Sequence, residues 1–159
     1  MTRELPTTTE RDVFITRAFD APRDVVWKFW TQPELITQWF GPTAFSVPLD
    51  TVEIDLRVGG VWNLAMADDV TGERFPIQGI ITACDEPEYL EITLSAQTGV
   101  GDVDNVVLRI QFHDHGDKTR ITLHQGPFDE VQRDLTVQGW ELSFVKLDTV
   151  LDQNEEHDA

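Results

Sequence analysis

Residues 21–42 read APRDVVWKFWTQPELITQWFGP and predict two short helices rich in aromatic side chains. Pro22 favours a helix start, because proline fits the first helical turn, where its missing N–H costs nothing. The first helix is expected over residues 23–30, with a shared apolar face made of Val26, Phe29 and Trp30. Pro33 interrupts it, and a second short helix over residues 34–39 ends at Gly41-Pro42.

Strand patterns lie on both sides of this stretch. Residues 11–19 alternate in a β-rich composition and predict a first strand. After the two helices, turn signals separate further segments with strand character, namely residues 45–49, 51–58, 61–67, 75–84, 89–96, 103–113 and 119–125. No helical segment lies between them, so we expect an antiparallel meander. One face of the strand at 103–113 should be buried, namely Val106, Leu108, Ile110 and Phe112.

Gly59-Gly60 lies between two of these expected strands. A phosphate-binding loop is not indicated, because no lysine follows the glycines and no helix begins there. The pair instead predicts a tight bend or bulge that lets the sheet curl.

The last element is a long helix over residues 129–153, about 25 residues and roughly 37 Å long. Its buried stripe is spaced four, three and four residues apart and consists of Trp140, Phe144, Leu147 and Leu151. The fold class predicted from these patterns is α+β: a curved antiparallel sheet wrapped around a long C-terminal helix, with two short helices after the first strand.

The 159 residues fit one domain. We expect it to span residues 11–153, between a flexible N-terminus at 1–10 and an acidic flexible tail at 154–159. No apolar run approaches the ~20 residues of a membrane span, and the N-terminus has no apolar core of a secretory signal, so we expect a cytoplasmic protein. The net charge of −17 would repel nucleic acid and anionic membranes alike.

Several motifs resemble one known family. They are the quoted stretch at 21–42, followed by Asp55, Gly59-Gly60, Trp62, Met66, Gly79, the segment PEYL at 87–90, the strand TRITL at 119–123 and Gly139-Trp140. In order and spacing they are similar to the activator of heat-shock protein ATPase homologue family, over residues 11–152. That family belongs to the START-like or Bet v 1-like (SRPBCC) superfamily. The resemblance implies a helix-grip fold with an internal cavity.

Relatives in the superfamily bind lipids, polyketides or antibiotics, act as cyclases or hydrolases, or assist a chaperone. The elements that line the cavity in similar proteins carry an aromatic set here, and aromatic walls suit a small apolar ligand. The residues expected to bind it are Trp27, Trp30, Trp39, Phe45, Trp62, Met66, Phe112, Trp140 and Phe144.

The sequence offers weaker support for a catalytic or metal-binding site. Polar groups that could reach a cavity are Glu53, Asp55, Arg57, Asn63 and Arg109, and no nucleophile with a partnered histidine is evident. His113 and His115 lead into a turn without a third ligand, so no metal is expected. His124 alternates with Thr122 and Arg120 and is expected to face solvent. Cys84 is expected to be a small apolar strand residue.

The preferred function is therefore sequestration, sensing or transport of a small apolar molecule, without a cofactor. A cyclase or hydrolase using the same cavity is one alternative. The other is a protein-interaction module, either a homodimer or a stimulator of a chaperone ATPase. A chaperone partner is less favoured, because the sequence shows no counterpart of the separate N-terminal domain of the eukaryotic co-chaperones.

Overall fold

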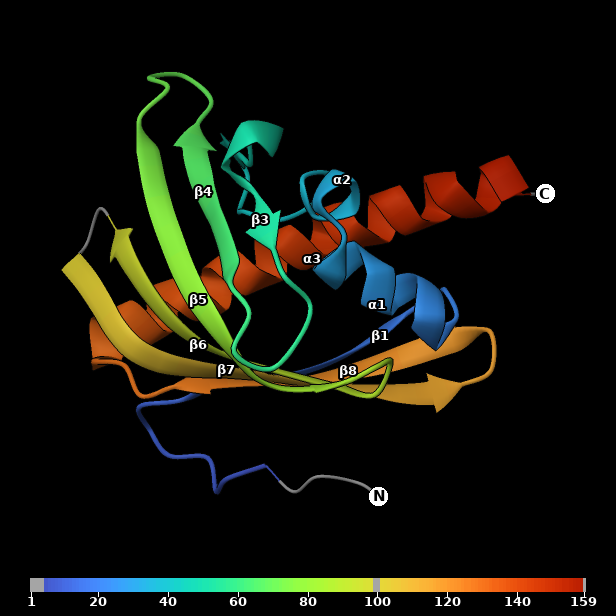
Figure 1. Ribbon diagram of the computed structural model, residues 1–159, viewed down its shortest axis with the longest axis horizontal. Helices are drawn as coiled ribbons and strands as arrows, with labels where there is room; N and C mark the ends of the chain where they lie inside the picture. The colour runs from blue at the N-terminus through green and yellow to red at the C-terminus, as the bar shows by residue number, and fades with distance from the viewer. Residues whose placement is uncertain (1–4, 99–100, 159) are drawn as a thin grey trace.

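The computed structural model describes residues 5–98 and 101–158, and side chains within 5–96 and 102–153. A curved antiparallel sheet wraps around one long helix (Figure 1). The elements, in chain order, are β1 Val13–Phe19, α1 Arg23–Thr31, α2 Pro33–Ile36, β2 Phe45–Ser46, the 3-10 turn η1 Leu49–Thr51, β3 Glu53–Ile54, β4 Trp62–Asp68, β5 Arg74–Asp85, β6 Tyr89–Thr98, β7 Gly101–His115, β8 Lys118–Gly126 and α3 Glu130–Asp158.

The predicted fold class is confirmed. The strand order is β1-β8-β7-β6-β5-β4-β2, with β3 pairing with β4, and neighbouring strands are antiparallel. Register shifts between Ile81 and Ala83 and between Leu94 and Ala96 interrupt the pairing of β5 and β6 with their neighbours. Such irregularities bend strands. The sheet therefore curls, and α3 crosses its inner face (Figure 1).

Side-chain periodicity places the core between α3 and the sheet. The predicted stripe of α3 is buried, and so are the inward residues of β7 from Val106 to Phe112. Helix α3 ends at Asp158 rather than Gln153. Side chains of residues 154–158, all of Ala159 and residues 1–4 lie outside the described part, so flexibility at the two ends stays a prediction.

The strands predicted at 45–49 and 51–58 are mostly absent, which is a correction. Pro48 has no N–H to donate to a ladder. Its carbonyl instead accepts hydrogen bonds from the backbone N–H of Thr51, at 3.0 Å, and from the Thr51 hydroxyl, at 2.7 Å. These bonds form η1, and only the two-residue strands β2 and β3 remain on either side of it.

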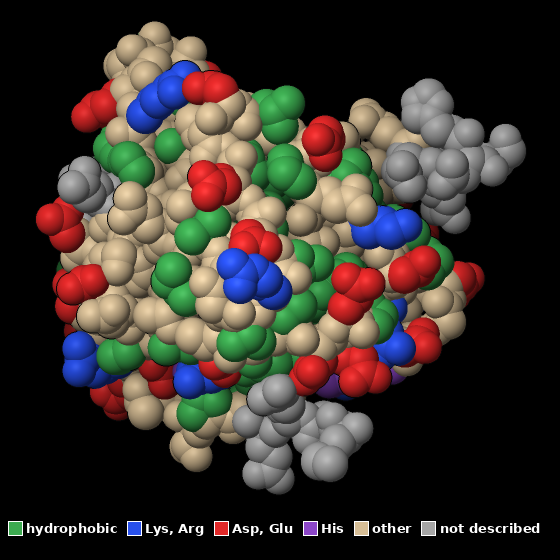
Figure 2. All heavy atoms as spheres, viewed as in Figure 1, with side chains coloured by type: hydrophobic (Ala, Val, Ile, Leu, Met, Phe, Trp, Pro, Cys, Tyr) green, Lys and Arg blue, Asp and Glu red, His purple; other side chains and the backbone are tan. Residues whose placement is uncertain are grey.

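The surface matches the composition. Figure 2 shows acidic side chains spread over one face among hydrophobic ones, and the net charge of the chain is −17. None of the described helices is long and apolar enough to span a bilayer.

The predicted bend at Gly59-Gly60 is present, and the two glycines serve different needs. Gly59 has φ of +86°, a left-handed backbone that costs other residues energy. At Gly60 an added Cβ would lie 2.0 Å from the carbonyl oxygen of Asp55. Gly59 N–H and Gly60 C=O both bond to Ile81, at 2.8 and 2.9 Å, so the bend is fixed to β5.

Alanine at these two positions should therefore have unequal effects. Gly60→Ala forces backbone apart and should lower the free energy of unfolding by about 3 kcal/mol or more. Gly59→Ala meets open space and should cost only the left-handed strain, about 1–2 kcal/mol. Urea unfolding of both variants measures the difference. Equal losses would contradict the steric account of Gly60.

Candidate functional site

The predicted aromatic residues form a packed cluster centred on Trp30. The Trp30 ring lies 4.8 Å from that of Trp39, 5.5 Å from Trp140 and 6.4 Å from Phe144, between ring centroids. Edge-to-face and stacked pairs of this kind are favourable beyond their buried area. The cluster fills the part of the core beneath α1 and α2.

Two of the indole N–H groups donate to backbone carbonyls, whereas that of Trp27 donates to Glu86 Oε1 at 3.1 Å. Trp39 Nε1 donates to the carbonyl of Phe29 at 2.8 Å, and Trp62 Nε1 donates to that of Trp30 at 3.1 Å. Trp30 Nε1 itself is buried without an acceptor among the described residues. These contacts connect α1 to the chain after α2 and to β4, so the cluster ties the short helices to the sheet.

An open cavity lies next to this cluster. Its volume is about 240 Å³, and it is bounded by the first half of α3, the inner faces of β5, β6 and β7, and the segment 40–42. Apolar walls come from residues including Phe40, Ile77, Leu94, Val106 and Phe128. A cavity lined in this way favours apolar ligands.

Two of the nine predicted residues, Met66 and Trp140, line this cavity. Trp27, Trp30, Trp39, Trp62, Phe112 and Phe144 lie in the core outside its lining, and Phe45 is half-buried against Phe75. A ligand role for these seven residues stays a prediction. Sequence reasoning missed Gln125 and the small residue Gly139. The glycine in mid-helix was the available signal, because glycine costs a helix about 1 kcal/mol.

The polar groups of the cavity are neutral. Gln125, Gln132, Thr136 and Ser143 are its polar side chains, and none of the described residues in its lining is ionisable. The hydroxyls donate within α3, from Thr136 to the carbonyl of Gln132 at 2.6 Å and from Ser143 to that of Gly139 at 2.8 Å. Acid–base catalysis needs a positioned titratable group, and the described residues of this lining supply none.

The polar residues suggested by the sequence lie elsewhere. Asp55 pairs with Arg57 on the surface at 2.7 Å, and Arg109 pairs with Glu91 at 3.3 Å. Asn63 Oδ1 accepts from the N–H of Gly79 at 3.1 Å, and Glu53 is exposed. None of these five residues lines the cavity.

A second, polar hollow of about 320 Å³ lies at the end of β7 and β8 near α1. His113 lies there with its Nε2 at 3.1 Å from the Thr122 hydroxyl. Burial lowers the pKa of His113, and the positive charges of Arg120, His115 and Arg23 lower it further. Across the described residues, no group of three or more His, Cys, Asp or Glu side chains is placed to hold a metal ion.

Cys84 is half-buried and without the features of a nucleophile. Burial raises the pKa of its thiol, and the negative charges of Glu86 and Asp85 raise it further. A thiolate is the reactive form, so this environment disfavours reactivity.

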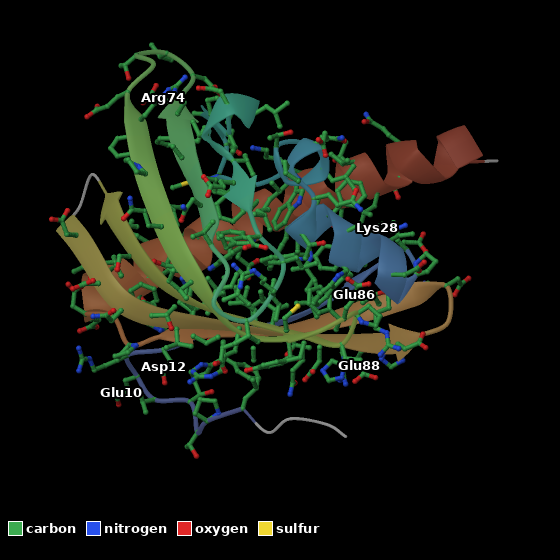
Figure 3. The ribbon with its side chains drawn as sticks, in the orientation of Figure 1. Glu10, Asp12, Lys28, Arg74, Glu86 and Glu88 are labelled. Atoms are coloured by element: carbon green, nitrogen blue, oxygen red, sulfur yellow. The ribbon has the colours of Figure 1, made fainter. Side chains whose placement is uncertain are left out.

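The prediction that His124 faces solvent is wrong. His124 does point to the outer face of β8, but the segment before β1 covers it, and it is 3% exposed. Asp12, which is labelled in Figure 3, covers the imidazole, and its Oδ2 lies 3.4 Å from His124 Nε2. The alternation of side chains along one strand does not show whether a segment distant in sequence buries its outer face.

Asp12 is held by several hydrogen bonds. Burial alone would raise the pKa of its carboxyl. The backbone N–H of Thr9 at 2.9 Å, the Thr9 hydroxyl at 3.1 Å and the neighbouring His124 outweigh burial and lower that pKa below its ordinary value. The carbonyl of Asp12 also accepts from Arg133 Nε at 3.0 Å, which links this segment to α3.

Comparisons with known proteins agree with this architecture. The family model described as "Activator of Hsp90 ATPase homolog 1-like protein" matches residues 20–152. No curated protein matches the chain significantly.

Solved structures share the fold over nearly their whole length. Protein NE0264 from Nitrosomonas europaea is 25% identical, with 94% of this chain and 99% of that chain covered, at a TM-score of 0.77. The AHSA1 (SPO3351) protein from Silicibacter pomeroyi is 21% identical, with coverage of 90% and 99% and a TM-score of 0.78. Protein CV1439 from Chromobacterium violaceum is 19% identical, with coverage of 89% and 97% and a TM-score of 0.78.

The lowered pKa of Asp12 predicts a specific acid sensitivity. A carboxyl whose folded pKa is lowered stabilises the fold above its unfolded pKa, near 3.8, and loses that contribution as pH falls through the folded pKa. Asp12→Asn should therefore lose stability at neutral pH and show a smaller further loss on acidification than the wild type. Thermal unfolding between about pH 7 and 2.5 measures both profiles.

Glu10→Gln is the matched control, since Glu10 is exposed on the same segment (Figure 3). It should keep the wild-type profile. Parallel profiles for Asp12→Asn and the wild type would mean that Asp12 does not supply this pH dependence.

Proposed function

The chain belongs to the family of Activator of Hsp90 ATPase homolog 1-like proteins, and from this premise we propose that it binds a small, mainly apolar molecule in the cavity beside Trp140. The ligand would occupy the cavity between the first half of α3 and the sheet. Within the aromatic cluster, Trp140 lines this cavity, whereas Trp30, Trp39 and Phe144 lie in the core outside its lining.

Gly139 is the observation that carries the proposal. It lies inside α3, where glycine costs about 1 kcal/mol relative to alanine. Apart from its two chain neighbours and the backbone of its own helix, no atom lies within 4 Å of a Cβ built there, and its φ is not in the left-handed range. Neither close packing nor backbone conformation therefore calls for glycine. Gly139 lines the cavity, so we infer that the open space at this position belongs to the cavity.

The cavity volume limits the ligand. An engineered apolar cavity of about 150 Å³ holds benzene, so about 240 Å³ suits a group larger than one ring. Ligand efficiencies of roughly 0.3–0.7 kcal/mol per heavy atom give about 4–8 kcal/mol of binding for roughly 12 atoms. That range corresponds to dissociation constants from about 1 mM to 1 µM.

The neutral lining favours binding over catalysis. A cyclase or hydrolase that uses this cavity would need a titratable group at the reacting atoms, and the described lining residues offer only amides and hydroxyls. Stimulation of a chaperone ATPase is the activity named in the family description. That role and a homodimer stay predictions.

Filling the cavity from Gly139 tests the proposal. Gly139→Leu should weaken binding of butylbenzene at least about tenfold, because the leucine side chain takes the ligand's place. The same change should raise the free energy of unfolding by about 1 kcal/mol or more, since leucine favours helix and buries apolar surface. Binding is measured by NMR from the shift of the Trp140 indole N–H, and stability by urea unfolding.

Gly139→Ala is the matched control. It gains the same helix propensity but adds only one methyl group, so stability should rise while the affinity for butylbenzene stays within about threefold of the wild type. Unchanged binding in Gly139→Leu, or no binding by the wild-type protein, would refute the proposal.

A further inference from the structure

Gln125 is a buried polar side chain of the cavity, and its amide has an unused donor. It lies on the inner face of β8, opposite Val13 and Leu108 in the sheet register, and is 7% exposed. A buried amide is costly unless its polar atoms are paired. An unpaired end of this side chain therefore indicates a partner outside the protein.

The orientation of the Gln125 amide follows from its neighbour. Trp140 Nε1 lies 2.8 Å from Gln125 Oε1. An indole nitrogen can only donate, so the group facing it must be the carbonyl oxygen. The NH2 group is consequently turned away from Trp140.

That NH2 group has no acceptor within the described part of the chain. No hydrogen bond from Gln125 Nε2 to a described residue is present, whereas Oε1 is satisfied by Trp140. Nε2 is also absent from the fully enclosed unpaired atoms of the described side chains, which are Trp30 Nε1 and the two ring nitrogens of His124. Since Gln125 lines the cavity, its Nε2 is open to the cavity.

The other polar groups cannot replace this donor. The hydroxyl protons of Thr136 and Ser143 are committed to helix carbonyls, so those oxygens can only accept from a ligand. Gln132 lies on the first turn of α3 and is only half-buried. Among the described lining residues, the Gln125 NH2 group is therefore the buried side-chain donor that a ligand can use.

No cation among the described residues lines the cavity to hold a carboxylate. Lys146 approaches the wall from outside, where its Nζ donates to the carbonyls of Gly41 at 2.9 Å and Phe45 at 3.1 Å. A carboxylate inside the cavity would be desolvated without a counter-charge, which is strongly unfavourable. The cavity therefore suits a neutral ligand.

We infer that the ligand is an uncharged, mainly apolar molecule with one hydrogen-bond acceptor, such as a ketone or ester carbonyl, and that Gln125 Nε2 donates to this oxygen. The inference rests on the proposed function. It adds a ligand class and a specificity-determining residue, and the Trp140 hydrogen bond is what orients that residue.

Three probes with one carbon skeleton test the ligand class: butylbenzene, butyrophenone and 4-phenylbutanoate. The quantity measured is the ratio of butyrophenone to butylbenzene affinity, from the Trp140 indole shift. In Gln125→Met this ratio should fall about three- to tenfold relative to the wild type, because one neutral hydrogen bond is lost. Comparing ratios between variants cancels the different hydration of the two probes. The wild type should bind 4-phenylbutanoate more weakly than butyrophenone.

Two further variants serve as controls, one for misfolding of Gln125→Met and one for the effect of a lining hydroxyl. Gln125→Leu also removes the NH2 donor and introduces no charge, so it should lower the ratio as Gln125→Met does, even if the methionine variant folds poorly. Ser143→Ala removes a lining hydroxyl that has no proton to give, and it should leave the ratio unchanged.

The outcomes separate the two claims. If neither butylbenzene nor butyrophenone binds to the wild type, both the proposed function and this inference fail. If both probes bind with the same ratio in the wild type and in the Gln125 variants, or if 4-phenylbutanoate binds most tightly, the inference is overturned while a binding function stands.

Discussion

The hydrogen bond from Trp140 to Gln125 divides the space between α3 and the sheet into two parts. On one side of the indole, Trp30 and Phe144 pack against it in the core, outside the lining of the cavity. On the other side, the same indole forms a wall of the open cavity. This hydrogen bond, at 2.8 Å, holds Trp140 to β8 at the boundary between the two parts.

This division explains which sequence predictions succeeded. The burial of Phe144 and Leu147 follows from helical spacing alone, and the burial of Leu108 and Ile110 follows from strand alternation, because both signals are local. Whether a buried aromatic residue touches a ligand or another side chain depends on packing between distant elements. Trp30 and Trp39 have the composition of a binding site, yet each is in contact with other aromatic rings.

The errors have the same physical origin. His124 alternates correctly on β8, but Asp12 covers it from a segment at the other end of the sequence. The strand predicted at 45–49 contains Pro48, whose carbonyl forms a turn with Thr51 in place of a ladder. Gln125 and Gly139 were not expected at the site. A single amide does not stand out in a sequence, and the cost of a mid-helix glycine does not by itself locate a cavity.

The most direct measurement of the central claim is a crystal structure under xenon pressure. Xenon enters dry apolar cavities and avoids sites with ordered water. We predict a xenon atom against Trp140 and Met66, with the Trp30 cluster unoccupied and unmoved. Ordered water throughout this cavity, or side chains collapsed into it with no xenon bound, would contradict the account.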